Sequence, residues 1–573
     1  MLGAKPIFAA FTLQLPFLLL FLTGVSPHCQ ISTAEECQKN ENFVPGYSLA
    51  GEGFDITTLE RKEAKMLDLN QWQRANGTCT LCQNPFLPGK PLQRLPLAAT
   101  DWVAKAACQR KIHTSLQSSG IGVVQAAAAD VKNDWKAGLD VPIQPGIQGQ
   151  VALAGSHSRM ADFTMEKSSQ DKYTFASHEV TCSYYSFGIN HWEKFTDHFK
   201  RALNNLPPKY QPDSQLEYHQ LIGTYGTHFI SHLQLGGRVR DVTALQVCKT
   251  VLDGVTADEV KDCLNIEASI SISGGSIRPN AAYSVCEELK KKKSFKGNFH
   301  QTYKERHTEV VGGGIHIDLL FSKDQNTEAY KEWLEDLKFM PALLSYSLQP
   351  IHTLVPKGDP KREGLQQAVT EYIKDRALWR NCTQPCPPGT QRSIQDPCSC
   401  VCPSTSITDS MCCSRERGLA RLTVTIQRAY DLKGDVFSHT DAFVKVIFKE
   451  KSFSTPIVRK NNNPVWNMQF DVGDITVLGE TTQIHIEVLD EDNYVFFQHH
   501  QKLGSCKESL QSGKPQNKIC YLTHGRLDFQ YHLVCGPHLG GRYCLDYVPE
   551  VPNYTGDLLQ RKSEANALKT QVP

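Results

Sequence analysis

The sequence predicts an α+β protein built from several domains and ending in a β-sandwich. Three observations support this prediction. The chain has 573 residues, which is too many for a single hydrophobic core. Helical and alternating segments mix between residues 29 and 375, cysteines crowd into residues 382–413, and strand-like runs dominate after residue 419. Each change of character marks an expected boundary between domains.

The first 26 residues have the pattern of a secretory signal peptide. Lys5 precedes an apolar run over residues 7–22, and small residues follow it. This order is typical of a leader that is cleaved near residues 24–28. A membrane anchor is the alternative, but the apolar run is short for a span. We therefore expect the protein to be secreted.

Cysteine usage agrees with export, because 20 cysteines in an exported chain are expected to form disulfides. The motif CTLC at residues 79–82 would suggest a redox or zinc site in a cytosolic protein, but here two structural disulfide halves are expected. Residues 382–413 hold an odd number of cysteines, seven, so at least one is expected to bridge to a neighbouring domain. Three sequons are predicted glycosylation sites: Asn76, Asn381 and Asn553.

The charge balance and the missing motifs limit the function classes. With 61 Lys+Arg and 60 Asp+Glu the chain is nearly neutral, so no nucleic-acid partner is expected. The sequence has no G-x-S-x-G elbow, P-loop, H-E-x-x-H motif or dinucleotide fingerprint. We predict that the protein is not an enzyme and has no catalytic residues. A catalytic triad assembled by the fold is the alternative.

Residues 263–275, CLNIEASISISGG, alternate almost without a slip. A period of two is typical of a half-buried strand, and ten such residues are also the length of a transmembrane strand. The segment is therefore either an ordinary core strand or a strand that crosses lipid. In the second case the lipid-facing side chains would be Leu264, Ile266, Ala268, Ile270 and Ile272.

Two loops of the C-terminal sandwich concentrate acidic residues. Asp435 and Asp441 flank one turn, and Asp490 and Asp492 are expected just after a strand. Ca²⁺ needs six to eight oxygen ligands, and carboxylates from two loops at one end of a sandwich supply them. Most acidic pairs in loops are simply solvated, which is the alternative.

The second acidic loop also carries four large apolar residues. Such a loop tip is expected to enter the lipid interface, since a contiguous apolar patch facing only water is rare. The alternative is that some of these side chains fold back onto the sandwich. The predicted membrane-binding residues are Tyr494, Val495, Phe496 and Phe497.

The motif YGTHF at residues 225–229 resembles the signature of the membrane-attack-complex/perforin (MACPF) domain of the perforin family. Further stretches match in the family's order at residues 43–59, 133–141, 154–158, 256–265, 299–313 and 544–550. GD-x5-TDAFVKV, NNNPVWNMQF and EVLDED resemble a C2 domain, and the cysteine-rich segment resembles an EGF-like module. The MACPF signature, YGTHF, comprises Tyr225, Gly226, Thr227, His228 and Phe229.

The resemblance implies an α+β multidomain fold. Its MACPF domain would hold a bent antiparallel sheet and two helical clusters, near residues 150–187 and 255–310, that unravel into membrane hairpins. In residues 147–155 of the first segment, Ile147, Val151 and Leu153 share one parity. The implied domains are the signal peptide 1–26, the MACPF domain 29–375, a small disulfide-rich EGF-like module 380–414, a C2 β-sandwich 418–540 and an extended, exposed tail 541–573.

The resemblance also implies a function. It implies a cytolytic protein, stored in cytolytic granules with co-delivered proteases, that docks on the phospholipid membrane of a target cell. Docking would use Ca²⁺, and a homo-oligomeric ring would then insert β-hairpins as a pore. A MACPF protein that docks without perforating, or a complement-like lytic component, is the alternative.

The resemblance assigns roles to particular residues. Gly312 and Gly313 would suit the hinge at which the implied bend opens, because glycine permits unusual backbone angles; a flexible turn is the alternative. The family's further third-loop aspartate is missing before Leu503, which predicts weaker Ca²⁺ binding. The implied Ca²⁺ ligands are Asp435, Asp441, Asp490 and Asp492.

Overall fold

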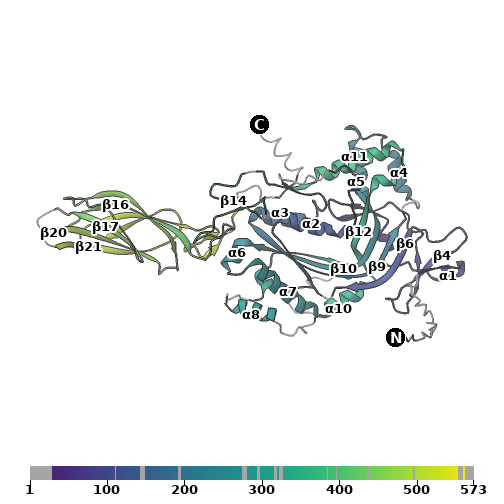
Figure 1. Ribbon diagram of the computed structural model, residues 1–573, viewed down its shortest axis with the longest axis horizontal. Helices are drawn as coiled ribbons and strands as arrows, with labels where there is room; N and C mark the ends of the chain where they lie inside the picture. Colours follow the sequence, from purple (N-terminus) through teal and green to yellow (C-terminus); the bar gives the residue numbers. More distant parts are fainter. Residues whose placement is uncertain are drawn as a thin grey trace, which may run out of the picture.

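The protein is elongated, with a large α+β region at one end and a slender β-sandwich at the other (Figure 1). The fold class predicted from the sequence is confirmed. The predicted leader, Asp435, Val495, Phe496 and Asn553 lie outside the described residues. The computed structural model describes residues 29–109, 111–141, 149–190, 195–273, 281–292, 297–314, 319–321, 327–383, 385–394, 396–434, 439–494, 497–552 and 559–561.

An eight-stranded antiparallel sheet forms the centre of the large region. Its main path runs β3-β2-β10-β9-β6, with β11 and β12 paired to β10 and β7 paired to β9. Register shifts interrupt β10 near Ile230 and Leu235, and such bulges bend a strand and increase its twist. The strands are β2 Glu52–Asp55, β3 Glu60–Lys65, β6 Ala99–Cys108, β7 His113–Gln117, β9 Tyr173–Ile189, β10 His228–Gln246, β11 Arg306–Val311 and β12 Ala342–Pro350.

The YGTHF signature forms the start of β10 and is part of the core. Gly226 has φ +78°, and a Cβ there would lie 2.4 Å from the Phe54 carbonyl oxygen, so only glycine fits. His228 is fully buried: its Nε2 donates to the Trp135 carbonyl at 2.9 Å, and its Nδ1 lies 2.8 Å from Thr227 Oγ1. The signature histidine is therefore a hydrogen-bonded core residue.

Three groups of helices surround the sheet (Figure 1). α2 and α3 lie on one side of the long strands, α7, α8 and α10 lie on the other, and α4, α5 and α11 cover one end. The helices are α2 Gly120–Ala127, η2 Ala128–Asp130, α3 Arg159–Gln170, α4 Asp197–Asn205, α5 Gln215–Tyr225, α6 Val247–Leu252, α7 Ala257–Ser273, α8 Ala281–Lys292, α9 Phe299–Thr302, α10 Thr327–Asp336, η3 Ile351–Leu354 and α11 Pro360–Asp375.

The first predicted cluster, residues 150–187, is only partly helical. α3 is a helix, but the residues from Tyr173 onward form β9 in the middle of the sheet. The reason is that β9 has strand partners on both sides, β10 on one and β6 and β7 on the other. These partners satisfy its backbone donors and acceptors as no helix at that place would.

A three-stranded sheet lies beside α2 and α3. In it β13 (Leu378–Asn381) pairs with β8 (Gly149–Ala152) and with β26 (Leu559–Arg561). Leu559 is buried against Ile121 and Leu378. The prediction of an exposed tail is therefore wrong for these residues, because the tail returns to the large region and completes a sheet.

Ten disulfides pair all 20 cysteines. Cys79 and Cys82 of the CTLC motif are structural halves, as predicted, and lie in a small sheet of β1 (Cys29–Ser32), β4 (Cys79–Gln83) and β5 (Leu92–Leu95). Cys82 bonds to Cys29 of β1, and Cys79 bonds to Cys37 of helix α1 (Ala34–Lys39). Cys413 pairs with Cys248 of α6. The predicted bridge from the cysteine-rich segment to a neighbouring domain is thereby confirmed.

The C-terminal region is a sandwich of two four-stranded sheets, ordered β19-β16-β23-β22 and β18-β17-β20-β21. Leu422, Val424 and Ile426 of β16 are fully buried in its core. Its strands are β16 Leu419–Tyr430, β17 Ala442–Phe448, β18 Lys451–Ser454, β19 Val465–Thr476, β20 Gln483–Tyr494, β21 Phe497–Ser509, β22 Gln516–Tyr521 and β23 Arg526–Cys535. The remaining short elements are η1 Tyr47–Leu49, β14 Gln391–Arg392, β15 Cys400–Val401, β24 Leu539–Gly540 and β25 Asp546–Tyr547.

Candidate membrane-inserting cluster and calcium-binding hairpin

The alternating segment 264–273 is helical and forms most of α7. The sequence carries a second period that explains this, since the buried residues of α7 recur at intervals of three and four. Such spacing places them on one face of a helix. The buried residues are Val260, Cys263, Leu264, Ala268 and Ser271. Residues 264–273 therefore carry two patterns: their buried side chains repeat at helical spacing, and their apolar side chains alternate as in a strand.

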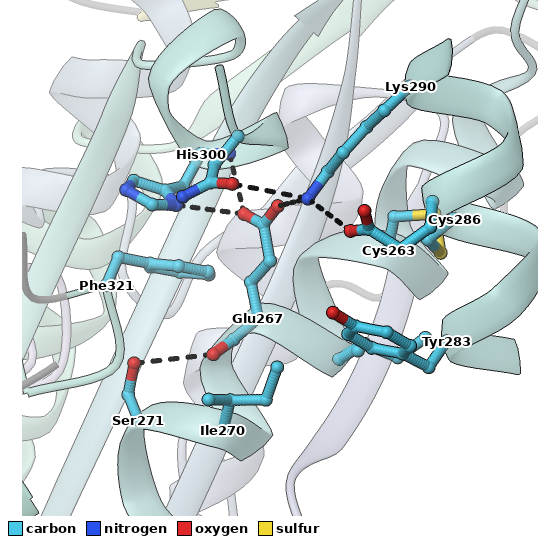
Figure 2. Close-up of a pocket in the computed structure, with 12 residues that line it drawn as sticks. Cys263, Glu267, Ile270, Ser271, Tyr283, Cys286, Lys290, His300 and Phe321 are labelled. Atoms are coloured by element: carbon cyan, nitrogen blue, oxygen red, sulfur yellow. Dashed lines mark hydrogen bonds and ion pairs between the residues drawn. A yellow bond between two sulfur atoms is a disulfide. The ribbon is translucent and has the colours of Figure 1, made fainter. Parts of the chain in front are cut away.

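Glu267 anchors α7 to its neighbours, and its side chain points toward Lys290 and His300 (Figure 2). Its carboxylate accepts hydrogen bonds from the backbone N–H groups of Phe299 and His300, at 2.9 and 3.0 Å. His300 Nδ1 lies 2.9 Å and Lys290 Nζ 3.2 Å from the same carboxylate. We call these four residues the Glu267 cluster; it joins α7, α8 and α9.

The electrostatics of the Glu267 cluster favour the carboxylate. Burial alone would raise the pKa of Glu267, since its side chain is 12% exposed. The hydrogen bonds from His300 and Phe299 and the charge of Lys290 outweigh burial and hold the pKa below its ordinary value. The contact therefore persists in mild acid.

The alternation of residues 263–275 did not reveal this anchoring role of Glu267. One signal was present: Glu267 is the only charged residue between positions 263 and 275. A single charge among Ser and Asn at the middle of a helix face indicates a specific partner. The partner itself, Lys290, lies 23 positions away and required the fold.

A disulfide and a small cavity complete the contact between α7 and α8. Cys263 of α7 is bonded to Cys286 of α8, with a Cα–Cα distance of 5.6 Å. Below it Ile270, Tyr283 and Phe321 line a cavity of about 120 Å³ (Figure 2). The two helices are thus covalently joined within their length, and the cavity lies beside the disulfide.

α7 also contacts the central sheet through His178 of β9. His178 Nε2 donates to the Lys261 carbonyl at 3.0 Å. Burial lowers the pKa of His178 to about 4, with smaller contributions from Arg306 and Lys261. The histidine is therefore neutral at physiological pH, and it must charge if the contact opens in acid.

The predicted hinge glycines follow the end of β11 directly. Gly312 and Gly313 have φ +81° and +75°, which only glycine adopts readily. Trp333 Nε1 of α10 donates to the Gly312 carbonyl at 2.9 Å, and a Cβ on Gly312 would lie 2.4 Å from the Gly236 carbonyl oxygen. The pair therefore packs closely between β10 and α10.

The acidic loops of the sandwich bring two of the predicted calcium ligands together. Asp490 is 2% exposed, and its Oδ1 accepts from the Asp441 backbone N–H at 2.7 Å. Asp441 lies 3.4 Å from Arg459, which also reaches Glu491 at 2.7 Å. Adjacent carboxylates of this kind are suitable donors for a hard cation, with Arg459 as the charge that the cation would displace.

The predicted position of Asp490 and Asp492 after a strand is wrong. Both lie within β20, which continues to Tyr494 and pairs with β21 from Phe497 onward. The strands extend because polar and aromatic residues such as His499 and Tyr494 keep a continuous ladder with their partners. Described pairing between the two strands thus reaches Tyr494 and Phe497.

The predicted calcium and lipid site is described in part. Asp435, Val495 and Phe496 lie outside the described residues, as do the side chains of residues 492–499. Within the described part of the chain, no group of three metal-ligating side chains is found. Asp441 and Asp490 therefore account for what is observed of the site. Asn76, a predicted glycosylation site, is exposed.

No helix within the described ranges is long and apolar enough to span a bilayer.

Comparison with known families and proteins gives consistent matches along the chain. The model of the MAC/Perforin domain matches residues 44–381, that of the perforin-1-like EGF domain residues 381–415, and that of the C2 domain residues 420–522. The chain is 44% identical to perforin-1 of Homo sapiens over 91% of its own length and 94% of that protein.

Two further relatives show how far the similarity extends. Perforin-1 of Mus musculus is 42% identical over 93% of the chain and 95% of that protein. The complement component C8 alpha chain of Oryctolagus cuniculus is 25% identical over 43% of the chain and 44% of that protein. The similarity to perforin-1 therefore covers all three regions, and the similarity to the complement chain covers less than half of the sequence.

Proposed function

Because the chain belongs to the MAC/perforin family, we propose that it is a secreted, calcium-dependent protein that lyses target cells by forming pores. The observation that carries this proposal is α7, a helix whose sequence alternates as a membrane strand does. Docking uses the β20–β21 hairpin of the C2 domain, which we call the C2 hairpin. A homo-oligomeric ring then assembles, and the membrane-spanning β-hairpins insert last. The signal-peptide pattern and ten disulfides support secretion.

In the inserted state alternate side chains of residues 264–273 face different surroundings. The set that includes Ile266 and Ile270 faces lipid, and the set that includes Asn265 and Ser269 faces an aqueous lumen. We call these two sets, and the side chains opposite them in the second strand, the lipid parity and the lumen parity. A single hairpin cannot stay in lipid because its edges leave backbone groups unsatisfied. Insertion therefore requires neighbouring subunits, which close the strands into a barrel.

The hinge glycines suit the opening that insertion requires. α7 and α8 must leave the face of the sheet, and β11 leads into Gly312 and Gly313 on the side where α10 packs. A change of backbone angles at two glycines costs less than at other residues. We propose that the sheet opens at this point.

Calcium binding at the C2 hairpin supports docking. Asp441 and Asp490, with Asp435 and Asp492, would hold the ion, which displaces Arg459 and reduces the negative charge near the membrane. The apolar tip at Tyr494 to Phe497 then enters the lipid interface. Burying one such side chain contributes about 1.5 to 3 kcal/mol, so the tip holds the domain reversibly.

The test of insertion compares two neighbouring positions of α7. Ile270→Asp puts a charge on the lipid parity, which destabilises the strand of every subunit in the bilayer, although by less than the about 2 to 4 kcal/mol that an arginine or lysine costs at mid-bilayer. Dye release from calcium-treated liposomes should be lost, while secretion and the circular-dichroism spectrum stay unchanged. Ser269→Asp, the matched control on the lumen parity, should retain dye release. Equal leakage from both variants would contradict the proposed hairpin.

Calcium dependence has its own test at Asp490. Asp490→Asn removes a ligand charge but keeps the acceptor for the Asp441 N–H, so the half-maximal calcium concentration for liposome binding should rise roughly tenfold. Asp471→Asn, on β19 of the other sheet, is the control and should leave calcium dependence unchanged. Binding and leakage that survive chelation would disprove the calcium requirement and leave the pore proposal intact.

Two rival functions give different outcomes in the same assay. A MACPF protein that docks without perforating would bind calcium-treated liposomes but release no dye and form no rings in electron micrographs. A lipid-metabolising enzyme would leave lipid products after incubation. A complement-like lytic component would need other chains for leakage, whereas we expect the purified chain to suffice.

A further inference from the structure

The Cys263–Cys286 disulfide joins two helices that, under the proposed function, both become strands of one hairpin. We propose that this disulfide stays oxidised during insertion and sets the register of that hairpin; this inference rests on the proposed function. Its Cα–Cα distance is 5.6 Å. Residues directly opposite each other in an antiparallel pair are separated by about 4.5 to 5.5 Å. One bond therefore suits both states.

The chain already uses disulfides between directly paired strand residues. Cys29 and Cys82 face each other in β1 and β4, and Cys108 and Cys182 face each other in β6 and β9. Both pairs are register partners as well as disulfide partners. A cross-strand disulfide at Cys263 and Cys286 would repeat an arrangement found elsewhere in this protein.

The register that the disulfide imposes aligns the apolar residues of both strands. If Cys263 faces Cys286, every pair of opposite residues has numbers that add up to 549. The pairs on the lipid parity are then apolar throughout: Leu264 with Val285, Ile266 with Tyr283, and Ala268 with Ala281. A shift by one residue would place the second strand's apolar residues in the lumen.

The lumen parity in the same register is polar or small. Asn265 faces Ser284, and Glu267 faces Ala282. Glu267 thereby leaves the Glu267 cluster and enters the aqueous lumen. The disulfide lies on this parity too, one residue beyond the lipid-crossing stretch, so it does not need to enter lipid.

The turn sequence gives the same register independently. Gly274 and Gly275 lie outside the described residues and contribute here by sequence alone. A two-glycine turn makes Ser273 and Ser276 partners, whose numbers also add up to 549. Pro279 then faces Ile270 at a position without hydrogen bonds across the pair, so its missing N–H interrupts none within the hairpin.

Charges beyond the disulfide favour this register as well. Opposite charges face each other in three of its pairs, and one pair, Asp262 with Glu287, has like charges. Between turn and disulfide each strand has ten residues, 264–273 and 276–285, the length that crosses a bilayer. The three opposite-charge pairs are Lys261 with Glu288, Glu259 with Lys290, and Asp258 with Lys291.

The first experiment asks whether the bond survives insertion. Pores of the unmodified chain are formed on phosphatidylcholine liposomes with calcium, free thiols are blocked with N-ethylmaleimide, and the ring fraction is mapped by mass spectrometry. We expect the linked Cys263–Cys286 peptide in the rings. Alkylated Cys263 and Cys286 in the rings would overturn the inference, because the bond would then have to open before insertion.

The second experiment measures the register, with the native disulfide retained. Asn265→Cys with Ser284→Cys places thiols opposite each other, within the Cα separation a disulfide spans. Asn265→Cys with Ala282→Cys, the matched control, places them diagonally at about 7 to 8 Å. After insertion and mild oxidation, the first pair should lose its free thiols and the second should retain them.

Dye release in the same samples distinguishes failure of the proposed register from failure of the proposed pore function. Normal release with cross-linking only in the diagonal pair, or equally in both pairs, overturns the register and leaves the pore proposal standing. No dye release and no rings from the unmodified chain overturns the proposed function, and the inference with it. Soluble protein oxidised before lipid is added shows whether the helical state alone forms either cross-link.

Discussion

β16 of the sandwich and α7 of the large region carry the same alternation of apolar and polar residues, yet β16 is a strand and α7 is a helix. In β16, Leu422, Val424 and Ile426 are buried in the sandwich core, and β19 and β23 pair with it on both sides. In α7, Leu264 and Ala268 are buried, and the helix packs against β9 and β7 without pairing to a strand.

The difference shows what decides between two compatible structures. Alternation alone permits a strand, but the backbone then needs partners on its edges. β16 has them within its own domain. α7 meets its backbone hydrogen bonds internally and is held by the Cys263–Cys286 disulfide and by noncovalent contacts, among them the Glu267 cluster, His178 and an N-terminal cap. Removing these contacts one at a time tests how firmly each one holds the helix.

The largest effect is expected at Glu267. Glu267→Gln removes the charge that Lys290, His300 and two backbone N–H groups share, and losing this mostly buried carboxylate costs about 3 kcal/mol. Amide hydrogen exchange in α7 should accelerate by about two orders of magnitude, whereas exchange in β16 should not change. Since the pKa of Glu267 is lowered, the contact of the unmodified chain should persist down to the ordinary titration range of a glutamate and be lost only as pH falls below that range.

The control for this change uses the same lysine. Glu287 also contacts Lys290, at 3.1 Å, but its side chain is 37% exposed. Glu287→Gln should therefore change exchange in α7 by less than about threefold, as expected for a solvent-screened pair. Similar effects from both variants would mean that the Glu267 cluster does not hold α7.

The sequence and its resemblance predicted the architecture well and the site only in part. The strand patterns of β16 and β17 led directly to the sandwich, because pattern and tertiary partners agree there. The odd cysteine count predicted the bridge made by Cys413. α7 was expected to be helical only from the resemblance, although its buried residues repeat at helical spacing. The contacts of Glu267 with Lys290 and His300 join residues 23 and 33 positions apart, which no local pattern encodes.

A smaller, pH-dependent effect is expected at His178. Its pKa is about 4 in the folded protein and about 6.5 in an unfolded chain, so the unfolded state binds more protons in between. Stability is therefore complete above about pH 6.5 and falls as pH drops toward 4. Between pH 7 and pH 5 this histidine should lower the free energy of unfolding by about 2 kcal/mol. Urea titrations at the two pH values measure it.

Replacing the histidine isolates its share. His178→Gln keeps a donor for the Lys261 carbonyl but does not titrate, so the difference between the two pH values should shrink by about 2 kcal/mol. His228, whose pKa burial also lowers to about 4, is the control, because it lies in the signature and not beside α7. His228→Gln should reduce the pH dependence of the global free energy of unfolding without changing amide exchange in α7 at pH 5. An unchanged pH dependence in His178→Gln would contradict the assigned contact.

The smallest effect is expected at the start of α7, where Thr256 and Glu259 form a reciprocal cap. Thr256 Oγ1 accepts from the Glu259 N–H at 3.1 Å, and Glu259 accepts from the Thr256 N–H at 2.8 Å. Thr256→Ala removes one half of this cap, so α7 should lose about 1 kcal/mol and its first turns should exchange about fivefold faster. Thr33→Ala removes the same cap from α1 and is the matched control. If α7 converts to a strand during insertion, Thr256→Ala should shorten the lag before dye release and Thr33→Ala should not, because α7 has to unwind and α1 does not.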